Sequence, residues 1–214
     1  MRFLCLLSAL LIVTASWSQS IINLDYAASP YEEVYLGYHY GDKQYIMDTL
    51  VLDGEGKINF QTEEDVPGGI YLIIYPRRSN DYSEFLWDGK EIDIKVIGDH
   101  QKKMPEIQIS NNAIAEKFVA YLDQLSKNRK ASESMNEAEK EKLNKDVEAY
   151  IQKEIDKNKK NQYGKMIAML RDPIIPEEIT DNSARFYYYR SVYLNNIPFN
   201  EEWIIRTPTY WNKI

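Results

Sequence analysis

The chain has 214 residues, 44% of them hydrophobic, and a formal net charge of −7. This length fits one large domain or two small ones, and the apolar content is sufficient for a hydrophobic core. The negative charge argues against a nucleic-acid-binding protein, because Lys and Arg make most contacts to phosphate backbones.

Residues 1–18 have the pattern of a secretory signal peptide. Arg2 gives a positive start, an apolar run extends from Phe3 to Ala15, and "SWS" places small residues at a cleavage site. The run is shorter than the about 20 residues that span a bilayer. We therefore expect an exported protein of the periplasm or cell envelope. Its mature chain would begin at Gln19 and have no transmembrane segment after cleavage.

The sequence offers few candidates for catalysis. Its one cysteine, Cys5, lies within the signal peptide, so the mature chain has no thiol for a disulfide, a nucleophile or a metal site. His39 is expected on a strand and His100 in a turn, and two histidines argue against a histidine-rich metal centre. No spacing selects a nucleophile and a base. We therefore expect neither a catalytic set nor a metal or cofactor site, and a protein that is not an enzyme.

Residues 19–110 show a period of two, which is typical of strands with one buried face. Turns recur about every ten residues, so the segment predicts seven or eight short strands in an antiparallel β-sandwich or barrel. Asp53 to Gly56, between two such runs, predicts a hairpin turn. "GIYLIIY", from Gly69 to Tyr75, is apolar on both faces and predicts a central strand. The alternating apolar positions include Val34, Leu36, Tyr38 and Tyr40.

Residues 111–214 change to a helical period. Asn112 is the expected cap of a first helix, and Asn136 with Glu139 has the pattern of a capping box before a second. A third helix is predicted from about Gln162 to Leu170. The apolar face of the first helix comprises Ile114, Phe118, Leu122 and Leu125. The sequence thus predicts an α+β protein, an N-terminal antiparallel β-sandwich followed by a helical segment.

The predicted fourth helix, "ARFYYYRSVYL" from Ala184 to Leu194, is rich in aromatic residues. We interpret the stripe on one of its faces as helix packing, and ligand stacking is the alternative. The stripe consists of Phe186, Tyr189, Arg190 and Tyr193.

The segments "DTLVLDGEGKINFQ", "GIYLIIYP" and "FLWDGKEIDIKVIGD" resemble an uncharacterised domain that commonly begins exported thioredoxin-family proteins of Gram-negative bacteria. The resemblance covers about residues 21–110 and implies a β-sandwich. Residues 184–214 are similar to a helical segment of the same proteins, and Arg206, Thr207 and Pro208 match its Arg-Thr-Pro in order. Residues 192–195 stand where relatives often have His-Tyr-Phe-Asp, which argues against a polar site there.

In such proteins a TlpA-like thioredoxin domain with a Cys-x-x-Cys pair follows the helical segment. The resemblance therefore implies a non-catalytic accessory or interaction region of a periplasmic thiol–disulfide exchange protein. Its partners would be a thioredoxin-like domain downstream of residue 214 and client proteins. Because domain ends are usually polar and this chain ends in "RTPTYWNKI", we expect the helical segment to be incomplete. A frameshifted or naturally truncated homologue would look the same.

The alternative is a free-standing exported binding module for a glycan or a peptide. The candidate binding residues are Tyr82, Phe85 and Trp87, which cluster near the turn residues of "SNDYSEFLWDG". Aromatic side chains serve ligand surfaces and cores alike, so core packing is the competing interpretation of Phe85 and Trp87.

Overall fold

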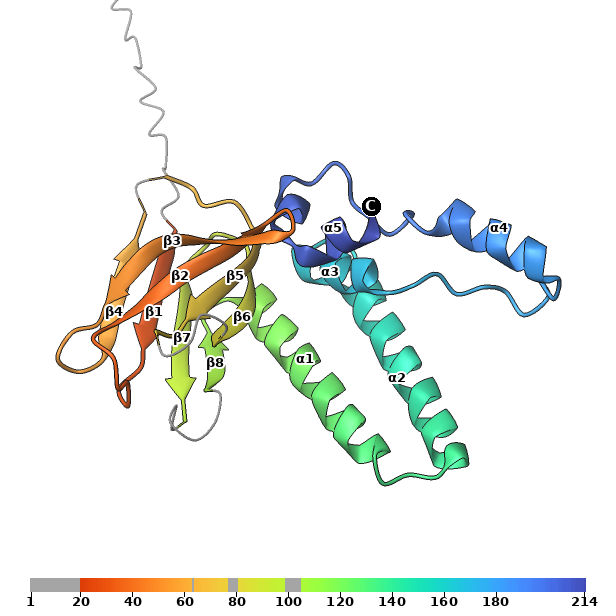
Figure 1. Ribbon diagram of the computed structural model, residues 1–214, viewed down its shortest axis with the longest axis horizontal. Coiled ribbons are helices and arrows are strands. Elements are labelled where there is room, and N and C mark those ends of the chain that lie inside the picture. The colour runs from red at the N-terminus through yellow and green to blue at the C-terminus, as the bar shows by residue number, and fades with distance from the viewer. Residues whose placement is uncertain (1–19, 63, 77–80, 99–104) are drawn as a thin grey trace, which may run out of the picture.

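The structure, a computed structural model, describes residues 20–62, 64–76, 81–98 and 105–214. The predicted signal peptide and His100 lie outside the described residues. Two four-stranded sheets pack face to face and are followed by a helical segment, which confirms the α+β prediction (Figure 1). The strands are β1 (Ile21–Asp25), β2 (Glu33–Tyr40), β3 (Lys43–Val51), β4 (Lys57–Gln61), β5 (Gly69–Ile74), β6 (Tyr82–Trp87), β7 (Ile92–Ile97) and β8 (Glu106–Ser110).

One sheet has the strand order β4-β1-β7-β8 and the other β3-β2-β5-β6. Antiparallel pairing dominates, as the sequence predicts, and β5 is a central strand between β2 and β6. β1 and β7 are parallel neighbours. Parallel strands need a long crossover, and the chain between β1 and β7 supplies it by building five other strands.

The predicted hairpin at Asp53 to Gly56 is wrong, although the turn itself forms. Asp53 Oδ1 accepts hydrogen bonds from the backbone N–H groups of Glu55 and Lys57, each at 2.8 Å, and Gly56 has a φ of 77°. The strands on either side, however, belong to different sheets, because β3 pairs with β2 and β4 pairs with β1. The turn therefore carries the chain from one sheet to the other.

The sandwich core lies between the two sheets and is dense in aromatic rings. The Tyr71 and Trp87 rings meet edge to face with their centroids 5.0 Å apart, and Phe85 lies 6.5 Å from Trp87. Such contacts add to the free energy gained by burying the rings. The fully buried aliphatic side chains around them include Ile22, Val34, Leu36, Leu50, Ile73 and Ile92.

At the end of β2 the buried and exposed residues differ from the predicted alternation. Tyr40 is 46% exposed although it has the parity of the buried Val34 and Leu36, while His39 is buried. The β2–β3 hairpin extends beyond the sandwich toward the C-terminal helices (Figure 1). Tyr40 is the last residue of β2 and does not belong to the sandwich core. The opposite face of β2 contacts the C-terminal segment, which covers His39 there.

The helical elements are α1 (Ala113–Ser132), α2 (Glu137–Asn158), α3 (Gln162–Leu170), α4 (Asn182–Val192), the 3₁₀-helix η1 (Glu202–Arg206) and α5 (Pro208–Lys213). The predicted caps are confirmed. The Asn112 side chain accepts a hydrogen bond from the Ala115 N–H, and Asn136 and Glu139 form both bonds of a capping box. These side chains satisfy N–H groups that have no partner within the helix.

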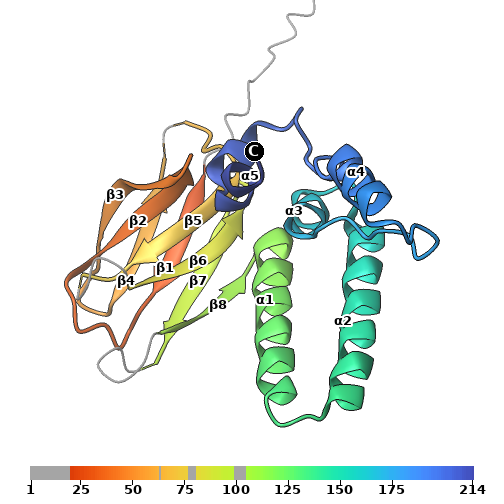
Figure 2. The ribbon, with the colours of Figure 1, turned by 45° about the vertical axis from the view of Figure 1, so that its right-hand side comes forward.

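The helices build a second core on the outer face of the β3-β2-β5-β6 sheet. Ile70 of β5 and Leu86 of β6 point out of the sandwich and pack with buried side chains of α1, α3 and η1, among them Phe118, Met166 and Ile204. α1 and α2 form an antiparallel pair with α3 at its upper end (Figure 2). Of the predicted apolar face of α1, Phe118 is buried and Ile114 and Leu125 pack against this core, whereas Leu122 is exposed. Ala115 and Tyr121 complete the buried face.

The predicted packing of the fourth helix forms only in part: Tyr189 and Tyr193 are half-buried, with the Lys213 ammonium 5.0 Å from the Tyr193 ring centre, whereas Phe186 is exposed. α4 has no buried residue, and in both views it lies at the far side of the helical segment from the sandwich (Figures 1 and 2). Of the aromatic residues near the chain end, Trp203 is buried, whereas Trp211 is exposed.

Candidate functional site

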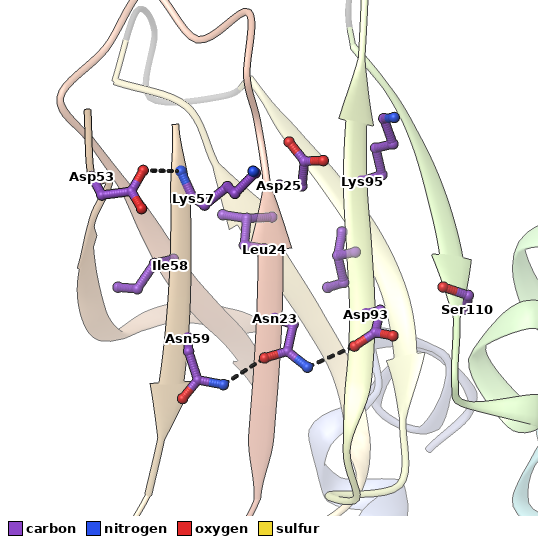
Figure 3. Close-up of a pocket in the computed structure, with 11 residues that line it drawn as sticks. Asn23, Leu24, Asp25, Asp53, Lys57, Ile58, Asn59, Asp93, Lys95 and Ser110 are labelled. Atoms are coloured by element: carbon purple, nitrogen blue, oxygen red, sulfur yellow. Dashed lines mark hydrogen bonds between the residues drawn. The ribbon is translucent and has the colours of Figure 1, made fainter. Parts of the chain in front are cut away.

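The outer face of the β4-β1-β7-β8 sheet carries a shallow polar pocket of about 520 Å³ (Figure 3). Asn59 donates a hydrogen bond to Asn23 Oδ1 at 2.5 Å, and Asn23 donates to Asp93 Oδ1 at 2.7 Å, so the three side chains link three strands. The two backbone hydrogen bonds to Asp53 hold the pKa of that carboxyl below its ordinary value. The side chains of Asn59, Asn23 and Asp93 therefore use hydrogen-bonding groups on one another. None of the described residues that line the pocket is aromatic. This arrangement stabilises a solvated sheet face.

A second pocket, of about 490 Å³, lies where the sandwich meets the helical segment. We name it the junction pocket. β2 and β3 form one wall, the loop before β5 forms another, and the end of η1 closes it. The residues that give it chemical character are Tyr38, Tyr40, Tyr71, Glu64, Asp65 and Arg206.

Arg206 is the central charged residue of the junction pocket. Its side chain is mostly buried, and its Nη1 atom is buried without a hydrogen-bond partner among the described residues. Nη1 forms a long ion pair with Glu202 Oε1, at 3.9 Å. The guanidinium carbon lies 5.9 Å from the centre of the Tyr40 ring, within the range of a cation–π contact. A buried guanidinium with a free N–H is a strong donor for an incoming acceptor.

Tyr71 supplies the floor of the pocket from the sandwich core. Burial raises the pKa of its hydroxyl well above the usual value of 10, and the positive charge of Arg206 acts in the opposite direction. The hydroxyl therefore stays neutral and donates a hydrogen bond to the Pro67 carbonyl at 2.5 Å. This bond ties the loop that carries Glu64 and Asp65 to β5.

The Arg-Thr-Pro run fixes the position of Arg206. Thr207 donates a hydrogen bond to the Ile204 carbonyl at 2.7 Å and accepts one from the Tyr210 N–H, so it both closes η1 and caps α5. Pro208 is the first residue of α5, where its missing N–H costs nothing. Gly69 lets the chain come close, because a Cβ there would lie 2.5 Å from the Arg206 Cβ.

α4 presents an aromatic surface that we define as Phe186, Tyr187 and Arg190. Phe186 and Tyr187 are 56% and 68% exposed, and their rings meet at 5.8 Å. The Arg190 guanidinium lies 5.6 Å from the Phe186 ring centre. The surface is therefore apolar and carries positive charge.

The candidate binding residues from the sequence do not form a shared surface. Phe85 and Trp87 are completely buried in the sandwich core, and Trp87 Nε1 donates to the Lys90 carbonyl at 2.5 Å. Only Tyr82 is partly accessible, at the start of β6. Because successive side chains of a strand point to opposite faces, Tyr82 and Phe85 lie on different faces of β6. Burial favours core packing of Phe85 and Trp87, and the structure points to the junction pocket in their place.

His39 has a structural partner. Its Nε2 lies 2.9 Å from Glu84 Oε1, so the pair links β2 to β6 on the outer face of the sheet. Within the described ranges, no three His, Cys, Asp or Glu side chains are grouped so that they could hold a metal ion. The helices among the described residues are all too short or too polar to cross a membrane.

The fold and the sites together define an α+β protein in which a two-sheet sandwich carries a docked helical segment. Residues 22–118, from β1 into α1, match the family described as "Domain of unknown function (DUF4369)". No curated protein and no solved structure matches the chain significantly.

Proposed function

We propose that this chain is a non-catalytic interaction region of an exported thiol–disulfide exchange protein. In this role the sandwich is a scaffold that holds the helical segment, and the aromatic surface of α4 contacts a thioredoxin-like domain. The observation that carries the proposal is the exposure of α4, an eleven-residue helix without a buried residue. Exposed aromatic and Arg side chains are enriched at protein interfaces. The thioredoxin-like partner, the export and the place in the cell envelope are taken from the sequence resemblance and the signal-peptide pattern.

Binding to a purified TlpA-like thioredoxin domain tests the proposal. We expect the double variant Phe186→Ser/Tyr187→Ser to weaken binding by about tenfold or more, since tenfold corresponds to about 1.4 kcal/mol and loss of a single aromatic hot-spot residue costs about 2 kcal/mol or more. Tyr45→Ser is the matched control, because Tyr45 is a similarly exposed ring on β3, away from α4. Equal loss in both variants, or no binding by the unmodified protein, would exclude α4 as the contact.

The absence of catalysis is tested separately by the reduction of insulin disulfides. The only cysteine is Cys5, so the mature chain would have no thiol to exchange. We expect no turnover by the purified mature protein, and turnover above the rate of reductant alone would contradict the proposal.

A free-standing binding module for a glycan or a peptide is the second candidate function. The junction pocket favours it, because a pocket with aromatic walls and a few convergent polar groups is the usual form of a small-ligand site.

A further inference from the structure

The lining of the junction pocket brings a hydrogen-bond donor of η1 together with two carboxylates of the loop before β5. On one side, Arg206 offers a buried N–H donor that has no partner among the described residues. On the other, Glu64 and Asp65 bring carboxylate acceptors on an exposed loop. Because a carboxylate only accepts and a guanidinium only donates, a ligand that satisfies both walls must itself donate and accept.

The charges around the pocket select against an ionic ligand of either sign. An anion that approached Arg206 would meet Glu64 and Asp65 in the lining, and Glu202 lies 3.9 Å from the Arg206 Nη1. A cation would meet the Arg206 guanidinium, which already lies against the Tyr40 ring. Like charges brought together at a binding site cost free energy. A neutral ligand avoids both repulsions.

Aromatic rings complete the pocket. Tyr40 is 46% exposed and offers an apolar ring surface to a ligand beside the polar walls. Tyr38 is half-buried and stacks on Tyr45, so it adds apolar surface at the edge of the pocket. The volume of about 490 Å³ falls within the about 300–1,000 Å³ of small-molecule pockets. Hydroxyl groups that both donate and accept, on a ring with apolar C–H faces, match this combination.

We infer that the junction pocket binds a neutral sugar ring. The ring stacks on Tyr40, one hydroxyl accepts a hydrogen bond from Arg206, and others donate to Glu64 and Asp65. This inference rests on the second candidate function and names its ligand class. It is independent of the aromatic surface of α4.

Sugars that share a ring but differ in charge test the inference directly. Isothermal titration of the purified protein would compare glucose, galactose and N-acetylglucosamine with the anions glucuronate and galacturonate and the cations glucosamine and galactosamine. The zwitterionic dipeptide Ala-Tyr is included as a peptide probe. We expect at least one neutral sugar to bind, and its charged counterparts to bind about tenfold more weakly.

Two variants locate the binding in the pocket. Arg206→Met keeps the apolar stem but removes the donors, and Tyr40→Ala removes the exposed ring; each should weaken binding of the neutral sugar by about tenfold. Tyr187→Ala, an exposed tyrosine on α4, is the matched control and should leave binding unchanged. The thermal unfolding of each variant is recorded. If Arg206→Met proves unfolded, Tyr40→Ala decides the outcome, because the exposed Tyr40 ring adds little to the core.

The outcomes separate the inference from the function on which it rests. Binding of Ala-Tyr without any neutral sugar would overturn the sugar inference and leave a peptide-binding module. Tighter binding of a uronate or an amino sugar would overturn the charge argument. Failure of every probe would overturn both the inference and the second candidate function. Loss of sugar binding in Tyr187→Ala, or none in Tyr40→Ala, would exclude the junction pocket as the site.

Discussion

Truncation of one buried side chain, Ile204→Ala, tests whether the sandwich and the helices fold as one unit. Ile204 in η1 is 2% exposed and belongs to the core that joins Ile70 and Leu86 of the sheet to α1 and α3. Removal of its outer carbons leaves a cavity where the helices pack on the sandwich. If this contact holds the sandwich and the helices together, the substitution should destabilise both parts.

The expected loss is about 2–5 kcal/mol, the range for a buried Ile replaced by Ala, because the cavity adds to the lost transfer free energy. This is a large share of a typical unfolding free energy of about 5–15 kcal/mol. For a protein of this size it corresponds to a fall in Tm of about 4–20 °C.

Urea denaturation gives the free energy of unfolding, and amide hydrogen exchange shows which elements open. We expect a single transition at lower urea, with exchange increased in both β5 and α3. Ile174→Ala is the matched control, since Ile174 is 67% exposed and its truncation should change stability by less than about 0.5 kcal/mol. Two separate transitions, or faster exchange in α3 alone, would show that the helices unfold independently of the sandwich.

Three further predictions concern single features of the fold. Limited proteolysis should cut first in the exposed turn at 133–136 and spare the sandwich, and first cuts within β5 would show that the core is misplaced. Gly89→Ala should cost about 1–3 kcal/mol in thermal unfolding, because Gly89 has a φ of 81° and an added Cβ would lie 2.1 Å from the Val66 carbonyl oxygen; unchanged stability would contradict that contact. The hydrogen bond from Lys165 lowers the pKa of Glu201 below 4.5, so its stabilisation is present above that pH and is lost as the pH falls through the lowered pKa. Glu201→Gln should therefore be less stable than the unmodified protein at neutral pH, and the difference should shrink in acid; a constant difference would refute the assignment.

Local signals in the sequence predicted the elements well. The period of two identified the strands. The caps were predictable because the side chains of Asn112 and Asn136 each bond to a backbone N–H three residues further along the chain. Such interactions depend on near neighbours in the chain, so they can be predicted from the sequence.

Strand partners and exposed faces could not be predicted in the same way. The turn after β3 has the composition of a hairpin, but pairing is decided by the distant β1, which takes β4 as its neighbour. The helical period likewise shows which residues of α4 share a face, but it does not show whether another element packs against that face. Both errors concern contacts between segments far apart in the sequence.

The junction pocket also depends on contacts between segments far apart in the sequence. Tyr40, Tyr71 and Arg206 come from three segments far apart in the sequence, so no local pattern predicts that they meet. Because Arg206 belongs to η1 and the two tyrosines belong to the sandwich, the complete pocket exists only while the helical segment is docked. A ligand that binds this pocket therefore stabilises the docked arrangement by mass action. Ile204→Ala, which loosens the same docking two residues away, should weaken binding at the pocket although Ile204 does not line it.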